Sequence, residues 1–292
     1  MSEAGDSLGQ APDGMRARRH PWAILGLWGW QTALALGASW PTASLIHAVF
    51  GASPRGDAEL WVPGGHALLD FLWHDAHALA PVTSTAKAVL LAAAILGLLP
   101  MAASMFAMTD DVGERRAFVL LRSISRALRA MPALLLLLVI ASAAQAGSVG
   151  LGWLVAKGVD MWFSEALGDA RAQRIGLAVA LVFVLAASGL GVVHDLARAV
   201  VVCSRTRALR ALVRGARAFA SSPLSIWWSW AWRALAALAP VVAIAAVASR
   251  IGGRGGFALV ALAVLHQGVV LARVALHLSW LAKAMRVVQR AP

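Results

Sequence analysis

Six long apolar runs restrict the fold of this chain more than any other feature of its sequence. Each run is close to the roughly 20 residues that a helix needs to cross a bilayer. Inside the hydrocarbon a helix satisfies every backbone polar group within its own segment. The sequence therefore predicts an all-α polytopic membrane bundle with six transmembrane helices, at about 22–49, 88–108, 133–156, 175–197, 224–248 and 257–281.

The composition supports this class. Of the 292 residues, 60% are hydrophobic and 14% are charged, whereas about 25% of the residues in a soluble domain are charged. So few charges cannot cover the apolar surface of a soluble domain. Residues 1–20 are polar and are predicted to form a disordered basic cytoplasmic tail, and residues 21–288 to form one six-span domain. The first run continues past Pro41 to Phe50, which favours a kinked helix over a signal peptide.

The distribution of lysine and arginine predicts the orientation, since cytoplasmic loops carry the excess of both. With the N-terminus in the cytoplasm, the cytoplasmic segments hold 17 of the 26 basic residues and the opposite side holds seven. The remaining two, Arg233 and Arg273, lie inside spans. Both termini are therefore expected in the cytoplasm. The abundance of arginine, alanine and glycine favours a bacterial chain in the inner membrane.

Two basic segments on the cytoplasmic side share one pattern. Each ends at a proline, Pro132 or Pro223, that is expected to begin the next span. Apolar residues between the arginines make both segments amphipathic, as in helices that lie in a membrane interface beside anionic headgroups. The arginines of each segment are spaced by four and then three residues, so they share one helix face: Arg122, Arg126 and Arg129 in the first, and Arg210, Arg214 and Arg217 in the second.

The net charge of +12 raises the question of nucleic-acid binding. Nucleic-acid binding needs a module that enters a groove or stacks on bases, in addition to a basic surface. The sequence contains no such module, so membrane lipids with anionic headgroups are the expected partners and nucleic acid is not. A protein-docking role for the two basic helices stays open, as does a homo-oligomer.

Ionisable side chains inside the spans are the candidate site residues, because they are costly at membrane depth. His266, Arg273 and His277 recur at intervals of seven and four and share one face of the last span. Arg233 and Arg273 both lie about 12–15 Å from the cytoplasmic boundary at 1.5 Å per residue. Two interpretations remain open. These four residues form a pocket for an anion or lipid headgroup, or the arginines snorkel to the interface and bond backbone carbonyls.

Other polar residues within the spans have simpler interpretations. Gln31, His47 and Gln145 are isolated and are expected to form hydrogen bonds between helices. Asp195 is the nearest acid to the two intramembrane arginines, and Arg198 competes for it.

The longest polar interruption contains a stripe of three histidines and an aspartate within about 80° of a helix face: His66, Asp70, His74 and His77. The spacing matches no standard zinc motif, so an amphipathic surface helix is expected and a metal site stays open. The single cysteine, Cys203, excludes an intramolecular disulfide. No catalytic or cofactor-binding motif is present, so the sequence predicts neither an enzyme nor a cofactor.

Three strings carry a resemblance to known proteins. They are DAELWVPGGHALLDFL at 57–72, HDLARAVVV at 194–202 and RALVRGARAFASSPLS at 210–225. With the alternation of spans and basic connectors, the chain resembles a family of bacterial six-helix integral membrane proteins. The layout is similar to that of the YciC-like and glycerophosphodiesterase-membrane-domain-like families. The resemblance implies a fold and a membrane location, and no functional residues carry over from it.

Three functions follow as hypotheses, of which the least favoured is a membrane enzyme that uses the outer stripe of His66, Asp70, His74 and His77. The first is a non-enzymatic, lipid-interacting scaffold or assembly subunit of the inner membrane. The alternative is a transporter or permease for a small molecule or lipid, with a polar path on the fifth and sixth spans. A transporter predicts a cavity that reaches Arg233 and Arg273, whereas a scaffold predicts no cavity and a large basic surface in the cytoplasm.

Overall fold

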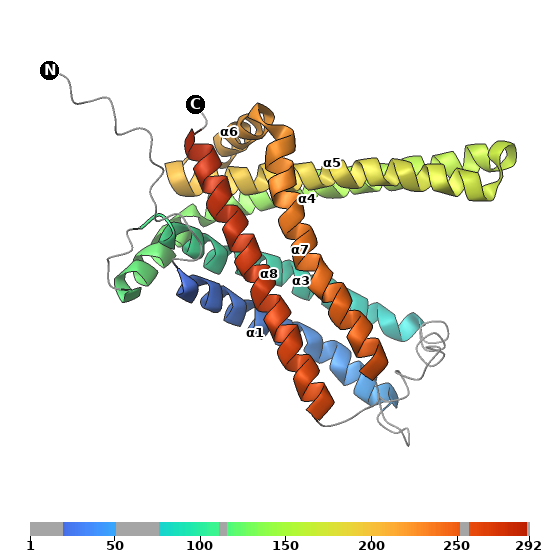
Figure 1. Ribbon diagram of the computed structural model, residues 1–292, viewed down its shortest axis with the longest axis horizontal. Coiled ribbons are helices and arrows are strands. Elements are labelled where there is room, and N and C mark those ends of the chain that lie inside the picture. The colour runs from blue at the N-terminus through green and yellow to red at the C-terminus, as the bar shows by residue number, and fades with distance from the viewer. Residues whose placement is uncertain (1–19, 51–75, 111–115, 252–256, 291–292) are drawn as a thin grey trace.

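The computed structural model describes residues 20–50, 76–110, 116–251 and 257–290, and within these ranges every element is an α-helix. The predicted all-α class is therefore confirmed. Figure 1 shows the arrangement of the helices, which are α1 (Pro21–Phe50), α3 (Ala76–Ala107), α4 (Arg116–Leu167), α5 (Asp169–Ser204), α6 (Ala208–Ser221), α7 (Pro223–Ile251) and α8 (Phe257–Arg290).

Five helices are long and apolar enough to cross a membrane, namely α3, α4, α5, α7 and α8. Little of this apolar length is covered by other parts of the chain, since the buried share of the spanning windows falls from 35% in α3 to 6% in α7 and α8. Large apolar side chains such as Trp162 and Leu224 are about four-fifths exposed, at 80% and 81%. Exposed apolar surface of this extent marks a membrane or interaction surface, so the fold is compatible with a multi-pass membrane protein.

Helix α1 matches the first predicted span closely, at Pro21–Phe50, and it continues through Pro41. It is not among the five helices that meet the spanning criterion. At 30 residues it is long enough to cross. A sixth span therefore stays a prediction.

Helices α4 and α5 form an antiparallel hairpin, and its far end projects away from the other helices (Figure 1). The two helices are joined at Gly168, whose φ of 77° favours glycine. Helix α4 has 52 residues, which corresponds to about 78 Å.

One expectation about α4 is wrong. The sequence places a separate basic helix before a span that begins at Pro132, but Pro132 lies inside the continuous helix α4. A proline in a helix interior removes one hydrogen bond and clashes with the preceding turn. Packing of the turns after Pro132, where Leu134 and Leu137 are buried in the core, holds the helix together across this point.

The second basic segment folds as predicted. Helix α5 ends at Ser204, and Arg205 turns the chain in the left-handed region with φ 50°. Helix α6 follows as a separate element and Pro223 opens α7. The buried face of α6 consists of small residues, which lets α6 approach α5 closely. These residues are Ala208, Ala211, Gly215 and Ala218.

The hydrophobic core lies where α3, α4, α5 and α8 meet, at the end of the bundle that carries α6 and the end of α8 (Figure 1). Its largest fully buried side chains include Trp280, Met285, Leu196 and Met105. The cavity described next adjoins this core, since Val274 and Trp280 belong to the core and also line the cavity.

Candidate functional site

A cavity of about 390 Å³ lies among α1, α7 and α8, within the range of about 300–1,000 Å³ that is usual for ligand pockets. Three of the four site residues predicted from sequence line it, namely Arg233, Arg273 and His277. The fourth, His266, is exposed and is not among the lining residues. It lies seven residues before Arg273, about 10 Å along α8. The remaining lining residues are Gln31, Trp230, Ala234, Ala237, Val270, Val274, Leu276 and Trp280.

Arg233 is held in place by serines on two helices. Its Nε donates a hydrogen bond to Ser279 Oγ on α8 at 3.0 Å. Its Nη1 donates to Ser229 Oγ at 2.8 Å and also to the Ser229 carbonyl one turn earlier on α7. The guanidinium lies 4.5 Å from the centroid of the Trp232 ring, within reach of a cation–π interaction. Among the described residues Nη2 has no hydrogen-bond partner, so it can serve a ligand.

Arg273 and His277 make no hydrogen bond or ion pair with the part of the chain that the structure describes, and Arg273 is exposed. None of the residues that line the cavity is acidic. Arg273 and Ser279, the partner of Arg233, are six residues apart on α8, or about 9 Å. The cavity is therefore lined by two arginines, and no described lining residue is a carboxylate that could neutralise them.

The geometry supports each of the two interpretations made from sequence for part of the site. Bonding to a backbone carbonyl holds for one nitrogen of Arg233, through the Ser229 carbonyl. The other terminal nitrogen of Arg233 and the whole guanidinium of Arg273 have no acceptor among the described residues. Arginine matches carboxylate and phosphate through paired, charge-assisted hydrogen bonds. The arrangement can therefore bind an anion at the cavity wall.

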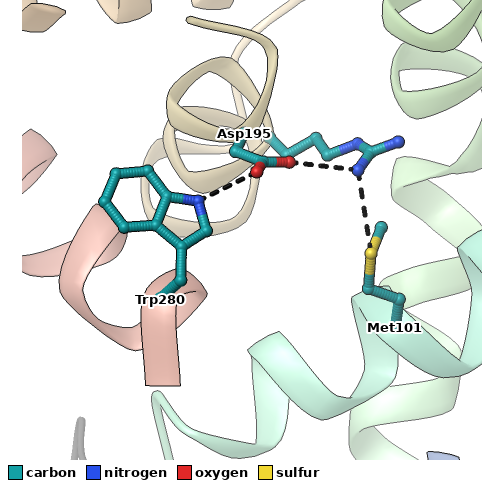
Figure 2. Close-up of polar contacts among 4 residues, drawn as sticks. Met101, Asp195 and Trp280 are labelled. Carbon is teal, nitrogen blue, oxygen red and sulfur yellow. Dashed lines mark hydrogen bonds and ion pairs between the residues drawn. The ribbon is translucent and has the colours of Figure 1, made fainter. Parts of the chain in front are cut away.

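Trp280 connects the cavity to a buried polar cluster. Its Nε1 donates a hydrogen bond to Asp195 Oδ2 at 2.9 Å, and Asp195 Oδ1 accepts one from Arg198 Nη1 at 3.3 Å (Figure 2). Arg198 also reaches the sulfur of Met101 on α3 at 3.8 Å. The predicted pairing of Asp195 with Arg198 is confirmed. Because Arg198 occupies this carboxylate, Asp195 does not neutralise the arginines of the cavity by direct contact.

Other polar residues from the sequence serve as links between helices. Gln145 Nε2 donates to the Ala187 carbonyl at 3.4 Å and joins α4 to α5, as predicted. Thr32 donates to Gln267 Oε1 at 3.1 Å and joins α1 to α8. Gln31 differs from the expectation, because it lines the cavity.

Sequence reasoning also missed Trp230 and Trp280 as lining residues. Tryptophan is abundant in α7, and neither residue has a charge or spacing that marks it. The tryptophan-rich string around Arg233 was the only available signal.

The six arginines of the basic segments occupy different environments. On α6, Arg210, Arg214 and Arg217 are all exposed. On α4, Arg122 and Arg129 are exposed, whereas Arg126 forms an ion pair with Asp110 and only 19% of its side chain is exposed. All three arginines of the stripe are therefore exposed on α6, whereas one of the three on α4 is partly buried in an ion pair.

The histidine stripe falls mostly outside the described residues. His66, Asp70 and His74 precede the described part of α3, and His77 lies within that helix without a described side chain. Within the residues that the structure describes, no group of three or more His, Cys, Asp or Glu side chains is placed to hold a metal ion.

Comparisons with protein-family profiles, with curated proteins and with solved structures find no match to this chain. The resemblance to six-helix bacterial families therefore stays a prediction.

Proposed function

We propose that this chain is a non-enzymatic, multi-pass protein of a bacterial inner membrane that binds an anionic lipid headgroup in the cavity among α1, α7 and α8. One observation carries the proposal. Arg273 and Arg233 line the same cavity, none of its described lining residues is acidic, and neither Arg273 nor Nη2 of Arg233 has an acceptor among the described residues. A cation in apolar surroundings is costly when it is unpaired, and a phosphodiester headgroup supplies the missing charge.

The proposal places six spans in the membrane, with α1 added to the five helices that meet the spanning criterion. The excess of basic residues on one side puts both termini in the cytoplasm. Helix α6 then lies at the cytoplasmic surface. Its exposed Leu209 and Val213 run beside the stripe of Arg210, Arg214 and Arg217. Apolar side chains next to exposed arginines suit an interface with anionic headgroups.

A transporter or permease is the second candidate, and the cavity itself favours it. A scaffold that acts only through its surface needs no internal space, yet Arg233 and Arg273 line about 390 Å³ of it. The same residues would then form part of a path for an anionic lipid or small molecule. Transport requires that the bound group leave on the other side of the membrane, and this requirement separates the two candidates.

Native mass spectrometry of the detergent-purified chain tests headgroup binding. The wild-type protein is expected to retain an anionic lipid, and Arg273→Gln to retain about tenfold less, as expected when one charge-assisted hydrogen bond is lost. Arg171→Gln is the matched control, because Arg171 is exposed at the start of α5 and does not line the cavity. Equal retention by both variants would contradict the proposal.

Reconstitution separates binding from transport. Vesicles that contain a fluorescent phosphatidylglycerol allow movement of the lipid between leaflets to be followed with a membrane-impermeant quencher. If the wild-type chain accelerates this movement and Arg273→Gln does not, the permease is supported. Binding without accelerated movement supports the non-transporting protein.

A further inference from the structure

A second, smaller cavity of about 130 Å³ lies where the end of α3, the first half of α4 and the junction between α5 and α6 meet. Three arginines line it, namely Arg126, Arg129 and Arg205, together with Thr206. The first two belong to the basic segment that the sequence singled out, whereas Arg205 and Thr206 belong to neither basic stripe. The cavity does not share any lining residue with the one among α1, α7 and α8.

The charges around this cavity are unbalanced. Arg126 Nη1 pairs with Asp110 Oδ1, and that carboxylate is only 6% exposed. Neither Arg129 nor the Arg205 side chain has a hydrogen-bond or ion-pair partner among the described residues. Asp110 itself is not a lining residue. Of the three lining arginines, only Arg126 pairs with a described carboxylate, and the side chains of Arg129 and Arg205 are available to bind an anion.

Thr206 adds an independent indication of a ligand. Its hydroxyl oxygen is buried and has no hydrogen-bond partner among the described residues, and a buried polar group without a partner costs free energy. Thr206 lines the same cavity as the arginines. A bound group with acceptor oxygens would accept hydrogen bonds from the Thr206 hydroxyl and from the arginines.

The backbone at the junction is also unusual. Arg205 has φ 50° and ψ 37°, and it is the one non-glycine residue with positive φ in the part of the chain that the structure describes. A side chain in this region is strained relative to glycine. Glycine is the usual residue at this position after a helix. The presence of arginine there is consistent with a role for its side chain, since its backbone conformation alone would favour glycine.

The size of the cavity limits the ligand. A space of roughly 10–15 Å³ already holds one water, so about 130 Å³ accommodates one tetrahedral anion. A phosphate group presents several acceptor oxygens to guanidinium donors and a hydroxyl donor at once.

We propose that this cavity binds a phosphate group, with Arg129, Arg205 and Thr206 as its donors and Arg126 shared with Asp110. The group belongs either to a phospholipid headgroup with a terminal phosphate or to free phosphate, since the chemistry of the two is the same at these donors. The proposal does not rest on headgroup binding at Arg233 and Arg273.

Titration of the purified full-length chain with two probes tests this proposal. The probes are dioctanoyl phosphatidic acid and inorganic phosphate, and binding is followed by calorimetry in a neutral detergent. Arg205→Gly and Arg129→Gln are each expected to weaken binding about tenfold, as for the loss of one charge-assisted contact. Arg205→Gly relieves the backbone strain, so lost binding would not reflect lost folding. Arg129→Gln provides a second variant at another position.

Two controls make the outcome specific. Arg171→Gln removes an exposed arginine at the start of α5 that lines neither cavity, and it should leave the affinity unchanged. Arg174→Gln removes another exposed arginine of α5 that lines neither cavity, and it should also leave the affinity unchanged.

The results distinguish the two sources of the phosphate group and test whether the cavity binds one. Binding of the lipid alone supports the headgroup, and competition between the two probes supports free phosphate. The proposal is overturned if neither probe binds the wild-type chain more tightly than Arg205→Gly, or if Arg171→Gln weakens binding equally.

Discussion

Arg233 carries five N–H donors, as every arginine does, and the structure uses them unequally. The Nε and Nη1 groups are committed to Ser279 and Ser229, so the guanidinium is fixed between α7 and α8. Arg273 has no such anchor and is exposed. A positioned arginine beside an unanchored one is suited to an anion that arrives from outside, because the first fixes the geometry and the second adapts to it.

Asp195 allows a direct prediction at this scale. It accepts hydrogen bonds from Trp280 and Arg198, and only 10% of its side chain is exposed. Asp195→Asn would leave Arg198 buried without a counterion, and breaking a buried ion pair costs about 3–5 kcal/mol. Chemical unfolding in detergent is expected to show a free energy of unfolding that is lower than that of the wild type by this amount.

Asp160→Asn is the matched control for this measurement, since Asp160 is exposed on α4 and should tolerate the same chemical change. If both variants unfold at the same denaturant concentration as the wild type, Asp195 does not stabilise the meeting of α3, α5 and α8.

The sequence predicted the residues of the cavity in part, for a physical reason. Charged groups in an apolar span stand out because they are costly there, so Arg233, Arg273 and His277 could be found. Gln31 could not be assigned, since a helix that is apolar on every side has no periodicity to show which face meets a neighbour. Arg205 was missed because its significance comes from its backbone conformation, which only the structure reveals.

At the scale of elements, the close approach of α6 to α5 depends on one glycine. A Cβ on Gly215 would lie 2.8 Å from the backbone nitrogen of Ala197 and 3.1 Å from its Cα. Backbone atoms cannot move aside as a flexible side chain can. Gly215→Ala is therefore expected to push α6 away and to destabilise the protein by about 1–3 kcal/mol, as overpacking does.

Gly268→Ala is the control for this prediction. Gly268 lies within α8, and an added Cβ would meet nothing within 4 Å. Alanine is the better helix former by about 1 kcal/mol, so this variant should keep or raise the unfolding temperature. An equal effect of the two substitutions would show that α6 does not pack as closely as the structure has it.

The continuity of α4 provides a second test of an element. Pro132 lies inside α4, where proline costs up to about 3 kcal/mol, so Pro132→Ala should raise the unfolding temperature. Pro223 begins α7, and a proline at a helix start costs nothing, so Pro223→Ala should not. If Pro132→Ala lowers stability, a span begins at Pro132, as the sequence suggested.

The two basic segments show why the sequence predicted one boundary and missed the other. Both have the same arginine spacing and both precede a proline. The second is separated from α5 by Arg205 in the left-handed region, whereas the first continues into apolar turns that pack in the core. Local pattern alone does not distinguish these cases, because tertiary packing decides whether a helix tolerates an internal proline.

At the scale of the whole molecule, length and apolar character made the helices predictable. The predicted runs correspond to α1, α3, α4, α5, α7 and α8, although most of these helices are longer than predicted. Helix α8, for example, continues to Arg290 instead of ending near residue 281. Hydropathy identifies only the apolar part of a helix. It does not detect polar turns that extend the helix beyond the apolar run.

The proposed orientation can be tested by cysteine labelling. In a Cys203→Ala background, single cysteines replace Asp169 at the end of the α4–α5 hairpin and Ser222 before α7, both of which are exposed. A membrane-impermeant maleimide added to intact cells should label Asp169→Cys, and should label Ser222→Cys only after permeabilisation. The opposite pattern would place both termini outside.

Photocrosslinking with a photoactivatable analogue of phosphatidylglycerol tests headgroup binding at the larger cavity most directly. In membranes that contain the wild-type chain, mass spectrometry should find adducts on the lining segments of α7 and α8, between residues 230–237 and 270–277. Arg273→Gln should lose these adducts, and Arg171→Gln should keep them. Adducts that spread evenly over the exposed apolar helices, or that persist in Arg273→Gln, would contradict an anion site in this cavity.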